Sequence, residues 1–264
     1  DSLSARMAIV KAKVLVFSHG HADLDKYIGK IVKPSGLIIN LNHSMNYLKS
    51  GQLYNPLLET MSKRQVKKIK QKICHFDFLL SSSTLEQENF RLSMPHMKSQ
   101  IILGGGAHLD KLRAMQINTS TNSKVILYFP TWRDKTIKPK ETVSEIIKKL
   151  VSNPKLIQWL KKSNYIFKIC FHINAKELDD FSEINNVFEI INIDSLADTL
   201  TKSDLLISDY SGAIIDALYI KKPVLFFPFD IEDYLKCRHL YVEYDKFAFG
   251  DVVTSVDDLV DNIV

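Results

Sequence analysis

The sequence predicts an α/β protein with parallel sheets, divided into two lobes. Short apolar runs typical of buried strands alternate with segments that have helical spacing or helix-start signals. This alternation favours parallel sheets, because a helix usually carries the chain back to the edge where the next parallel strand begins. A small polar stretch without periodicity, residues 118–123, is the expected linker between residues 1–117 and residues 124–264.

Four strands are expected in the N-terminal part, at residues 14–17, 36–41, 77–80 and 100–103. Lys11 and Lys13 interrupt the apolar stretch at the start of the chain, so we interpret this stretch as a strand and not as a signal peptide. A long basic helix is expected from Pro56 to about His75, with apolar residues at helical spacing. The segment SSSTLEQENF, residues 81–90, predicts the start of another helix.

The C-terminal part has five expected strands, at residues 124–129, 165–171, 187–191, 205–207 and 224–227. Helices are expected at residues 139–160, 196–200 and 254–263. The most informative stretch is residues 203–234, SDLLISDYSGAIIDALYIKKPVLFFPFDIEDY. It predicts a strand, a tight turn at Asp209–Gly212, a helix and a second strand. Such a turn offers backbone N–H groups and the positive end of a helix dipole to a phosphate.

Composition restricts the class of protein only broadly. The chain has 264 residues and a formal net charge of +5, which suits an anionic partner but does not select one. Cys74, Cys170 and Cys237 are far apart and form no metal or redox motif, so reduced thiols in a cytosolic protein are expected. No apolar run reaches the roughly 18–20 residues that a membrane-spanning helix needs.

Several chemically active residues directly follow predicted strands. They are His43, Arg133, His172 and the Asp209–Gly212 turn. Ligands of open parallel sheets bind outside the carboxyl ends of the strands. Two histidines, an arginine and an anion-binding turn at such edges predict a site that handles phosphate.

At these residues the sequence resembles the CDP-glycerol glycerophosphotransferases, the family of teichoic-acid and capsule polymerases. The resemblance covers roughly residues 10–264 and is strongest at 203–260. The family pattern S-D-x-x-x-x-D-Y-S-S, followed by K-P-x-x-F and D-x-E-x-Y, occurs here with Gly212 in place of the second serine. The family's P-T-[FW]-R matches Pro130–Arg133, and its second histidine matches His172.

Two further motifs match more loosely. The family's H-G-T-P-x-K-x-x-G loop is HSMNYLKSG here and keeps His43, Lys49 and Gly51. Its G-x-P-R-x-D segment is GGAHLD, which keeps Gly105 and Asp110.

The resemblance implies a GT-B-like fold, with two Rossmann-type lobes and an interlobe cleft. Residues 1–117 would form the acceptor-side lobe and residues 124–264 the lobe that binds the CDP-linked donor. We expect the first lobe to be truncated upstream, because it is short for this fold and residue 1 is not methionine. The implied reaction transfers a polyol phosphate from the CDP-linked donor to a hydroxyl and releases CMP. Glycerol, ribitol or another polyol remain open.

The resemblance also implies roles for particular residues. His43 is the expected general base, for which an imidazole with a pKa near neutrality is suited, and His172 is a second catalytic residue. Arg133, Asp209, Ser211 and Gly212 are expected to bind the donor phosphates. Further substrate contacts are expected at Lys49, Asp110, Asp216 and Glu232. No metal and no cofactor are expected, because basic side chains and a helix N-terminus replace the cation.

Some of these residues have a purely structural alternative. Arg133 can be a salt-bridge partner of Asp134 or of a helix carboxylate. Asp209 and Ser211 can simply cap the helix that follows them. The basic segment Lys63–Lys72 is either a solvated helix face or a contact with an anionic membrane surface.

The expected partners are CDP-glycerol or a related CDP-polyol and a phosphate-containing polymer or lipid-linked acceptor, with no nucleic acid. The expected location is the cytoplasm, peripheral to the inner face of the cell membrane. Two alternatives differ in function. One is a GT-B glycosyltransferase or nucleotide-sugar epimerase that uses a UDP-sugar, which the glycine at position 212 slightly favours. The other is a non-catalytic lobe that only binds donor or polymer within a longer polymerase.

Overall fold

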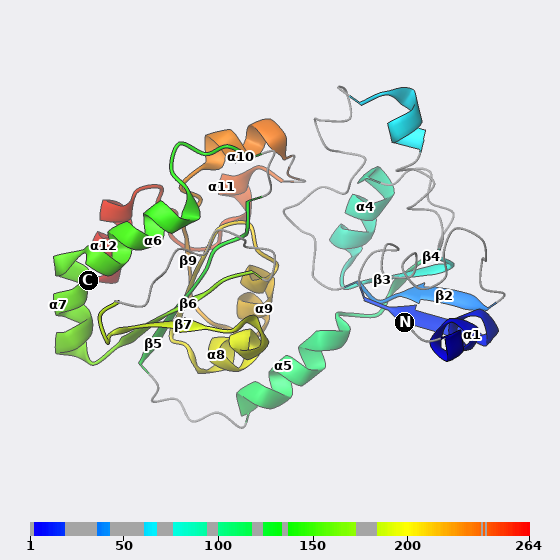
Figure 1. The fold of residues 1–264 in the computed structure, drawn as a ribbon, viewed down its shortest axis with the longest axis horizontal. Coiled ribbons are helices and arrows are strands. Elements are labelled where there is room, and N and C mark those ends of the chain that lie inside the picture. The colour runs from blue at the N-terminus through cyan, green and yellow to red at the C-terminus, as the bar shows by residue number, and fades with distance from the viewer. Residues whose placement is uncertain are drawn as a thin grey trace. The chain divides into compact units, whose positions relative to one another are not determined.

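The computed structural model describes residues 3–18, 36–42, 61–67, 76–93, 100–117, 124–133, 137–172, 184–238, 240 and 242–264 (Figure 1). The chain forms two compact units, which divide between His108 and Leu109. Each unit contains one parallel sheet, so the predicted α/β class with two parallel sheets is confirmed.

The sheet of the first unit has four parallel strands in the order β1-β2-β3-β4. They are β1 (Val14–Phe17), β2 (Leu37–Asn40), β3 (Phe78–Ser81) and β4 (Gln100–Leu103), which confirms the four expected strands. Gly36 precedes β2 at a close approach of two chain segments. A Cβ atom there would lie 2.2 Å from the carbonyl oxygen of Ala12, so only glycine fits.

The start of the chain differs from the prediction. The strand expected at residues 14–17 is β1, but the apolar residues before Lys11, interpreted as part of a strand, belong to helix α1 (Leu3–Lys11). Alanine, methionine, leucine, lysine and arginine all favour helix, and their intrinsic preference explains the difference. The expected helix near residue 84 is α4 (Thr84–Ser93). Of the long helix expected from Pro56 to His75, residues 61–67 are described. Residues 63–67 are helical, but residues 61 and 62 are not, so the segment does not run as one unbroken helix from Pro56.

The sheet of the second unit has five parallel strands in the order β7-β6-β5-β8-β9. They are β5 (Val125–Phe129), β6 (Ile166–Cys170), β7 (Phe188–Ile191), β8 (Leu205–Ser208) and β9 (Val224–Phe226), as expected. Counted along this unit, the order is third, second, first, fourth, fifth. This is the order of a Rossmann-type half, in which the chain reverses direction across the sheet between its first and fourth strands. That point lies between β5 and β8.

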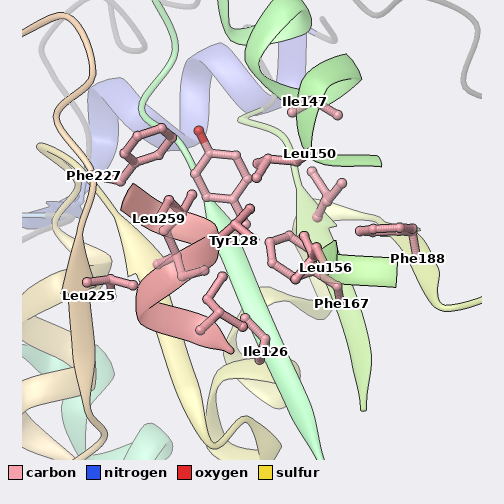
Figure 2. Packing of buried hydrophobic residues seen from close by; sticks show 14 of the residues in the cluster. Ile126, Tyr128, Ile147, Leu150, Leu156, Phe167, Phe188, Leu225, Phe227 and Leu259 are labelled. Atoms are coloured by element: carbon pink, nitrogen blue, oxygen red, sulfur yellow. The ribbon is translucent and has the colours of Figure 1, made fainter. Parts of the chain in front are cut away.

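Helices cover both faces of the second sheet (Figure 1). One face is covered by α6 (Val143–Ser152), α7 (Pro154–Ser163) and α12 (Val256–Ile263), and the other by α8 (Leu196–Lys202) and α9 (Ala213–Tyr219). Figure 2 shows Leu150, Leu156 and Leu259 packed together with Tyr128 and Phe167 of the sheet. These leucines are fully buried, and burial of each stabilises the fold by about 1.5–3 kcal/mol.

The single helix expected at residues 139–160 is two helices, α6 and α7. Asn153 ends α6 in an extended conformation, and its side-chain oxygen accepts a hydrogen bond from Leu156 N at the start of α7. Pro154 occupies the first turn of α7, where its missing N–H has no cost. At the start of α6, Thr142 and Glu145 form a capping box. The break therefore follows from a proline preceded by a capping residue.

Helix α5 (Ala107–Ile117) lies almost entirely in the second unit, although residues 1–117 were expected to form the first lobe. Leu109 and Leu112 of α5 are buried, and Gln116 Nε2 donates a hydrogen bond to Ile220 O at 2.6 Å. The second unit therefore begins before the expected linker at residues 118–123, which lies outside the described residues. Two short helices, α10 (Ile231–Cys237) and α11 (Tyr244–Phe247), complete this unit. In the described parts of the chain, no helix has the length and apolarity required to cross a membrane.

Candidate functional site

The candidate site lies at the carboxyl ends of β5 and β8. These two strands are hydrogen-bonded neighbours at the point where the strand order reverses. The segment Pro130–Arg133 follows β5, and the Asp209–Gly212 turn follows β8. From here the chain leads to α6 on one face of the sheet and to α9 on the other (Figure 1). Rossmann-type sheets bind their ligands at this position.

Asp209 joins the two strand ends. Its Oδ1 accepts hydrogen bonds from Thr131 N at 2.9 Å and from Tyr210 N at 2.6 Å. Its Oδ2 accepts a hydrogen bond from Arg133 Nη2 at 2.9 Å. The residue is 1% exposed. Asp209 does not cap the helix that follows, since the N-cap of α9 is Gly212 and has no side-chain capping bond.

Arg133 lies in the interior, against two carboxylates. Its Nε and Nη2 donate hydrogen bonds to the two oxygens of Asp230, both at 2.7 Å, and Nη1 donates to Thr131 O. The side chain is 8% exposed. Its guanidinium carbon lies 5.1–5.6 Å from the ring centres of Tyr210, Phe229 and Tyr234. The structure thus places Arg133, expected to bind phosphate, in a buried ion-pair network.

The electrostatics of this network keep Arg133 charged. Burial alone lowers the pKa of Arg133, but the charges of Asp209 and Asp230 outweigh it and hold the pKa above its ordinary value. Burial also raises the pKa of Tyr210 and of Tyr234 well above their ordinary values, and the nearby aspartates add to this effect. Both phenols therefore stay neutral at physiological pH.

The turn after Asp209 has a fixed backbone with two N–H groups that are not engaged by the described residues. Ser211 Oγ accepts a hydrogen bond from Ala213 N at 3.2 Å, so the predicted capping interaction of Ser211 is present. Tyr244 OH donates to Asp209 O at 2.7 Å and fixes the turn from the interior side. Among the described residues, no acceptor bonds the backbone N–H groups of Ser211 and Gly212. Both residues are half-buried, and their N–H groups remain available to an anion.

His172 follows β6, the other neighbour of β5, at the same edge of the sheet. Its imidazole stacks on the indole of Trp132, with ring centres 6.2 Å apart and an angle of 23° between the planes. Both side chains are half-buried. The fold therefore brings His172, the segment after β5 and the Asp209–Gly212 turn to one edge of one sheet, as expected from the sequence.

The other predicted substrate residues have different surroundings. Asp216 is half-buried on α9, and Asp110 is exposed on α5. Glu232 is exposed on α10 and lines an open cavity of about 840 Å³. The cavity also borders Asp230 and Lys140, but its described lining includes neither His172 nor the Asp209–Gly212 turn. His43 and Lys49 lie outside the described residues.

Sequence reasoning missed Asp230 and the tyrosines of the network. Asp230 is the first residue of the D-x-E-x-Y motif, for which only Glu232 was assigned a role. The third motif residue, Tyr234, stacks on Tyr210 with ring centres 3.7 Å apart. Asp230 is 6% exposed and Tyr234 is 2% exposed. The D-x-E-x-Y motif was the signal that could have pointed to Asp230 and Tyr234. It does not show, however, whether its residues contact a ligand or pack in the interior.

A second buried carboxylate lies in the first unit. Glu86 of α4 is 1% exposed, and its Oε2 accepts hydrogen bonds from Ser82 N and Ser82 Oγ, both at 2.7 Å. Its Oε1 accepts from Asn42 Nδ2 at 3.1 Å. Glu86 therefore ties the segment after β2 to the segment after β3. In the sequence, Glu86 is visible only as part of a helix-start signal.

In the described part of the chain, no group of three or more histidine, cysteine, aspartate or glutamate side chains has an arrangement that could hold a metal ion. At the carboxyl edge of the second sheet, the described residues instead offer the backbone N–H groups of Ser211 and Gly212 and the imidazole of His172.

A Rossmann-type parallel sheet whose strand order reverses between β5 and β8 is the arrangement of a lobe of a GT-B-like fold. The chain belongs to the CDP-glycerol:poly(glycerophosphate) glycerophosphotransferase family, which it matches over residues 1–264. The predicted family and fold class are thus confirmed.

Individual relatives agree with this assignment. The minor teichoic acid biosynthesis protein GgaB of Bacillus subtilis is 28% identical over 186 residues, which are 64% of this chain and 20% of that protein. The teichoic acid poly(glycerol phosphate) polymerase of Bacillus subtilis is 27% identical over 224 residues, 77% of this chain and 29% of the polymerase. The chain spans 13–29% of the length of the first four curated relatives that it matches.

Solved structures show the same fold. The wall teichoic acid polymerase TagF has a TM-score of 0.65 at 24% identity, over 88% of this chain and 59% of that chain. A UDP-GlcNAc 2-epimerase of Methanocaldococcus jannaschii has a TM-score of 0.52 at 14% identity, over 99% of this chain and 71% of that chain. At these identities both comparisons establish the fold alone.

Proposed function

We propose that this chain transfers glycerol phosphate, or a related polyol phosphate, from a CDP-linked donor to a hydroxyl of a growing polymer of the teichoic-acid or capsule type. Membership of the glycerophosphotransferase family supports this proposal. The relatives include a teichoic acid poly(glycerol phosphate) polymerase and ribitol-phosphate polymerases. A histidine variant of TagF has been solved after a soak with CDPG.

The observation that carries the proposal is the pair of unengaged backbone N–H groups in the Asp209–Gly212 turn. The N–H groups of Ser211 and Gly212 have no acceptor among the described residues and lie at the reversal point of the sheet. Backbone N–H groups held in fixed positions stabilise the negative charge of a phosphate without rearranging. We assign them to the pyrophosphate of the donor, with Ser211 Oγ as an additional contact.

The transfer breaks one bond and forms another. The acceptor hydroxyl oxygen attacks the phosphorus of the polyol phosphate, and the bond from this phosphorus to the oxygen bridging it to CMP breaks. CMP leaves with that oxygen. The hydroxyl proton passes to a general base, which we assign to His43. His172, oriented by its stack on Trp132, is assigned to the charge that develops on the phosphates.

The remaining assignments concern substrate and location. Lys49, Asp110, Asp216 and Glu232 are proposed as further substrate contacts. Lys63, Arg64 and Lys67 are exposed, which suits contact with an anionic polymer or with the inner face of the membrane. The cytoplasm and this peripheral location are proposed on that basis.

The test is release of CMP from CDP-glycerol in the presence of a poly(glycerol phosphate) acceptor, with CDP-ribitol and UDP-GlcNAc as alternative donors. The proposal predicts CMP release that requires the acceptor and falls strongly in His43→Ala and His172→Ala. The surface variant Lys155→Gln is the control. Turnover of UDP-GlcNAc instead would favour the glycosyltransferase or epimerase alternative. Binding of CDP-glycerol without any CMP release would favour the non-catalytic lobe.

A further inference from the structure

We propose that Arg133 and Asp230 form a buried positioning pair, which holds the Asp209–Gly212 turn in the geometry that receives the donor phosphate. This inference rests on the proposed function of the turn. It assigns Arg133 to the protein interior and not to the substrate. It also gives a role to Asp230, the first residue of the D-x-E-x-Y motif, which had no assigned role.

The arginine connects three segments of the chain. Its Nη1 donates to Thr131 O after β5, and its Nη2 donates to Asp209 after β8 at 2.9 Å. Its Nε and Nη2 donate to both oxygens of Asp230, after β9, at 2.7 Å. One cation thus fixes the ends of three neighbouring strands relative to one another. The planar fork of arginine is suited to this task, because it presents several donors in fixed directions.

Aromatic rings close the space around the pair. Tyr210 stacks on Tyr234, and the guanidinium lies over both rings and over Phe229. Tyr210 OH also donates a hydrogen bond to Asp230 Oδ1 at 3.3 Å. Tyr210 is itself part of the turn, so Asp230 holds the turn through this phenol as well as through the arginine. These contacts leave the Arg133 side chain only 8% exposed.

This arrangement disfavours direct binding of phosphate by Arg133. Four donor–acceptor contacts already engage the guanidinium, and a ligand would have to break some of them in a buried place. A bound phosphate instead meets the N–H groups of Ser211 and Gly212, whose positions depend on Asp209. The pair therefore acts through the turn. Misplacement of a binding group by about 1 Å can lower a rate by about 100-fold.

The first experiment is a double-mutant cycle with Arg133→Gln, Asp230→Asn and the double variant, measured as kcat/KM for CMP release from CDP-glycerol. Each single change should lower kcat/KM by about 10- to 100-fold, and the double variant should be no worse than the poorer single variant. Arg133→Lys should not restore activity, because lysine lacks the fork. An unaffected Asp230→Asn, additive losses, or restoration by lysine would each overturn the proposal.

The second experiment separates positioning from general stability and needs no donor. Hydrogen exchange should accelerate in Asp230→Asn within residues 209–216 and remain unchanged within α7 and β6. Equal acceleration throughout the second unit would mean loss of stability alone and would overturn the positioning role. Asp261→Asn breaks the exposed ion pair with Lys155 and is the matched control. If Arg133→Gln does not fold, Asp230→Asn decides the question, since it keeps the size of the side chain.

The two experiments also distinguish this inference from the proposed function. If the wild-type chain releases no CMP with any CDP-polyol, the proposed function fails. Local acceleration of exchange at residues 209–216 in Asp230→Asn would still establish that the pair holds the turn. If wild-type turnover is present and exchange is unchanged, only the positioning pair fails.

Discussion

The carboxylate of Asp209 accepts a hydrogen bond from the backbone N–H of Thr131 at 2.9 Å, and this contact joins the ends of β5 and β8. These strands neighbour each other in the sheet although they are far apart in the sequence. The contact sets the position of the turn that presents the N–H groups of Ser211 and Gly212. The geometry of the candidate site therefore depends on a buried carboxylate that is only 1% exposed.

Asp209→Asn should destabilise the second unit and lower CMP release together. An amide has one acceptor oxygen, so its NH₂ group would face a donor of Arg133 or of the backbone. Leaving a buried donor without an acceptor costs about 1–3 kcal/mol, which urea denaturation would detect as a lower free energy of unfolding. Asp198→Asn, which breaks the exposed pair with Lys202, should change it by no more than about 0.5 kcal/mol. Equal effects of both variants would contradict the role of Asp209.

Gly212→Pro tests the backbone N–H at the turn. Gly212 has φ −60°, which proline adopts without strain, and its N–H has no acceptor among the described residues. The change should therefore leave the thermal midpoint nearly unchanged while lowering kcat/KM for the donor by about 10-fold or more. Gly212→Ala keeps the N–H, so its kcat/KM for the donor should fall less than that of Gly212→Pro. If the two variants lose activity equally, the N–H is not the group that binds phosphate.

Stability should fall in alkaline solution because of buried tyrosines. Burial, with the nearby aspartates, raises the pKa values of Tyr210, Tyr234 and Tyr244 above their ordinary value of 10. Below pH 10 these tyrosines are protonated in both the folded and the unfolded chain, so their contribution to the free energy of unfolding is fully present. Above it, only the unfolded chain loses these protons, so the free energy of unfolding declines as pH rises.

The measurement is the free energy of unfolding from pH 8 to pH 11, together with tyrosinate absorbance. Replacing one of these residues, as in Tyr244→Phe, removes one titrating group and should reduce the slope above pH 10. The same variant also loses the hydrogen bond to Asp209 O, so its stability at pH 8 should be lower. A slope that does not change on this substitution would argue against the tyrosines as its cause.

The break between α6 and α7 can be tested through its caps. Asn153→Ala removes the acceptor for Leu156 N, a hydrogen bond of 3.1 Å, and should lower the free energy of unfolding by about 0.5–2 kcal/mol. Ser195 is the N-cap of α8 but makes no side-chain capping bond. Ser195→Ala is therefore the matched control and should change stability by less than about 0.5 kcal/mol. A larger loss at Ser195 than at Asn153 would contradict this account of the two caps.

Much of the fold could be predicted because its signals are local. The nine strands in the described residues are short apolar runs bounded by turn residues or charges, and each occurs where it was expected. Helix α1 was missed because an apolar run of this length does not distinguish strand from helix. The break at Asn153 was missed although Pro154 was visible, because helical periodicity continues across it.

The candidate site divides in the same way. The Asp209–Gly212 turn, His172 and the segment after β5 are local features at strand ends, and the sheet brings them together as expected. The environment of Arg133, by contrast, is formed by residues that are distant in the sequence. Its partner Asp230 is 97 residues away in sequence, and a motif shows neither burial nor direction of a side chain. The expectation of an open phosphate ligand at Arg133 is therefore replaced by a proposal of positioning.

The sequence by itself determined the α/β class, the positions of the nine described strands, and the small-residue turn after β8. These follow from periodicity, helix-start signals and the small residues of the turn, all of which act over a few neighbouring residues. Only the tertiary structure decided which strands are neighbours and that Arg133 faces two aspartates instead of solvent. The reason is physical: burial and charge pairing arise between segments that chain folding brings together, and their free energies depend on surroundings that no local pattern records.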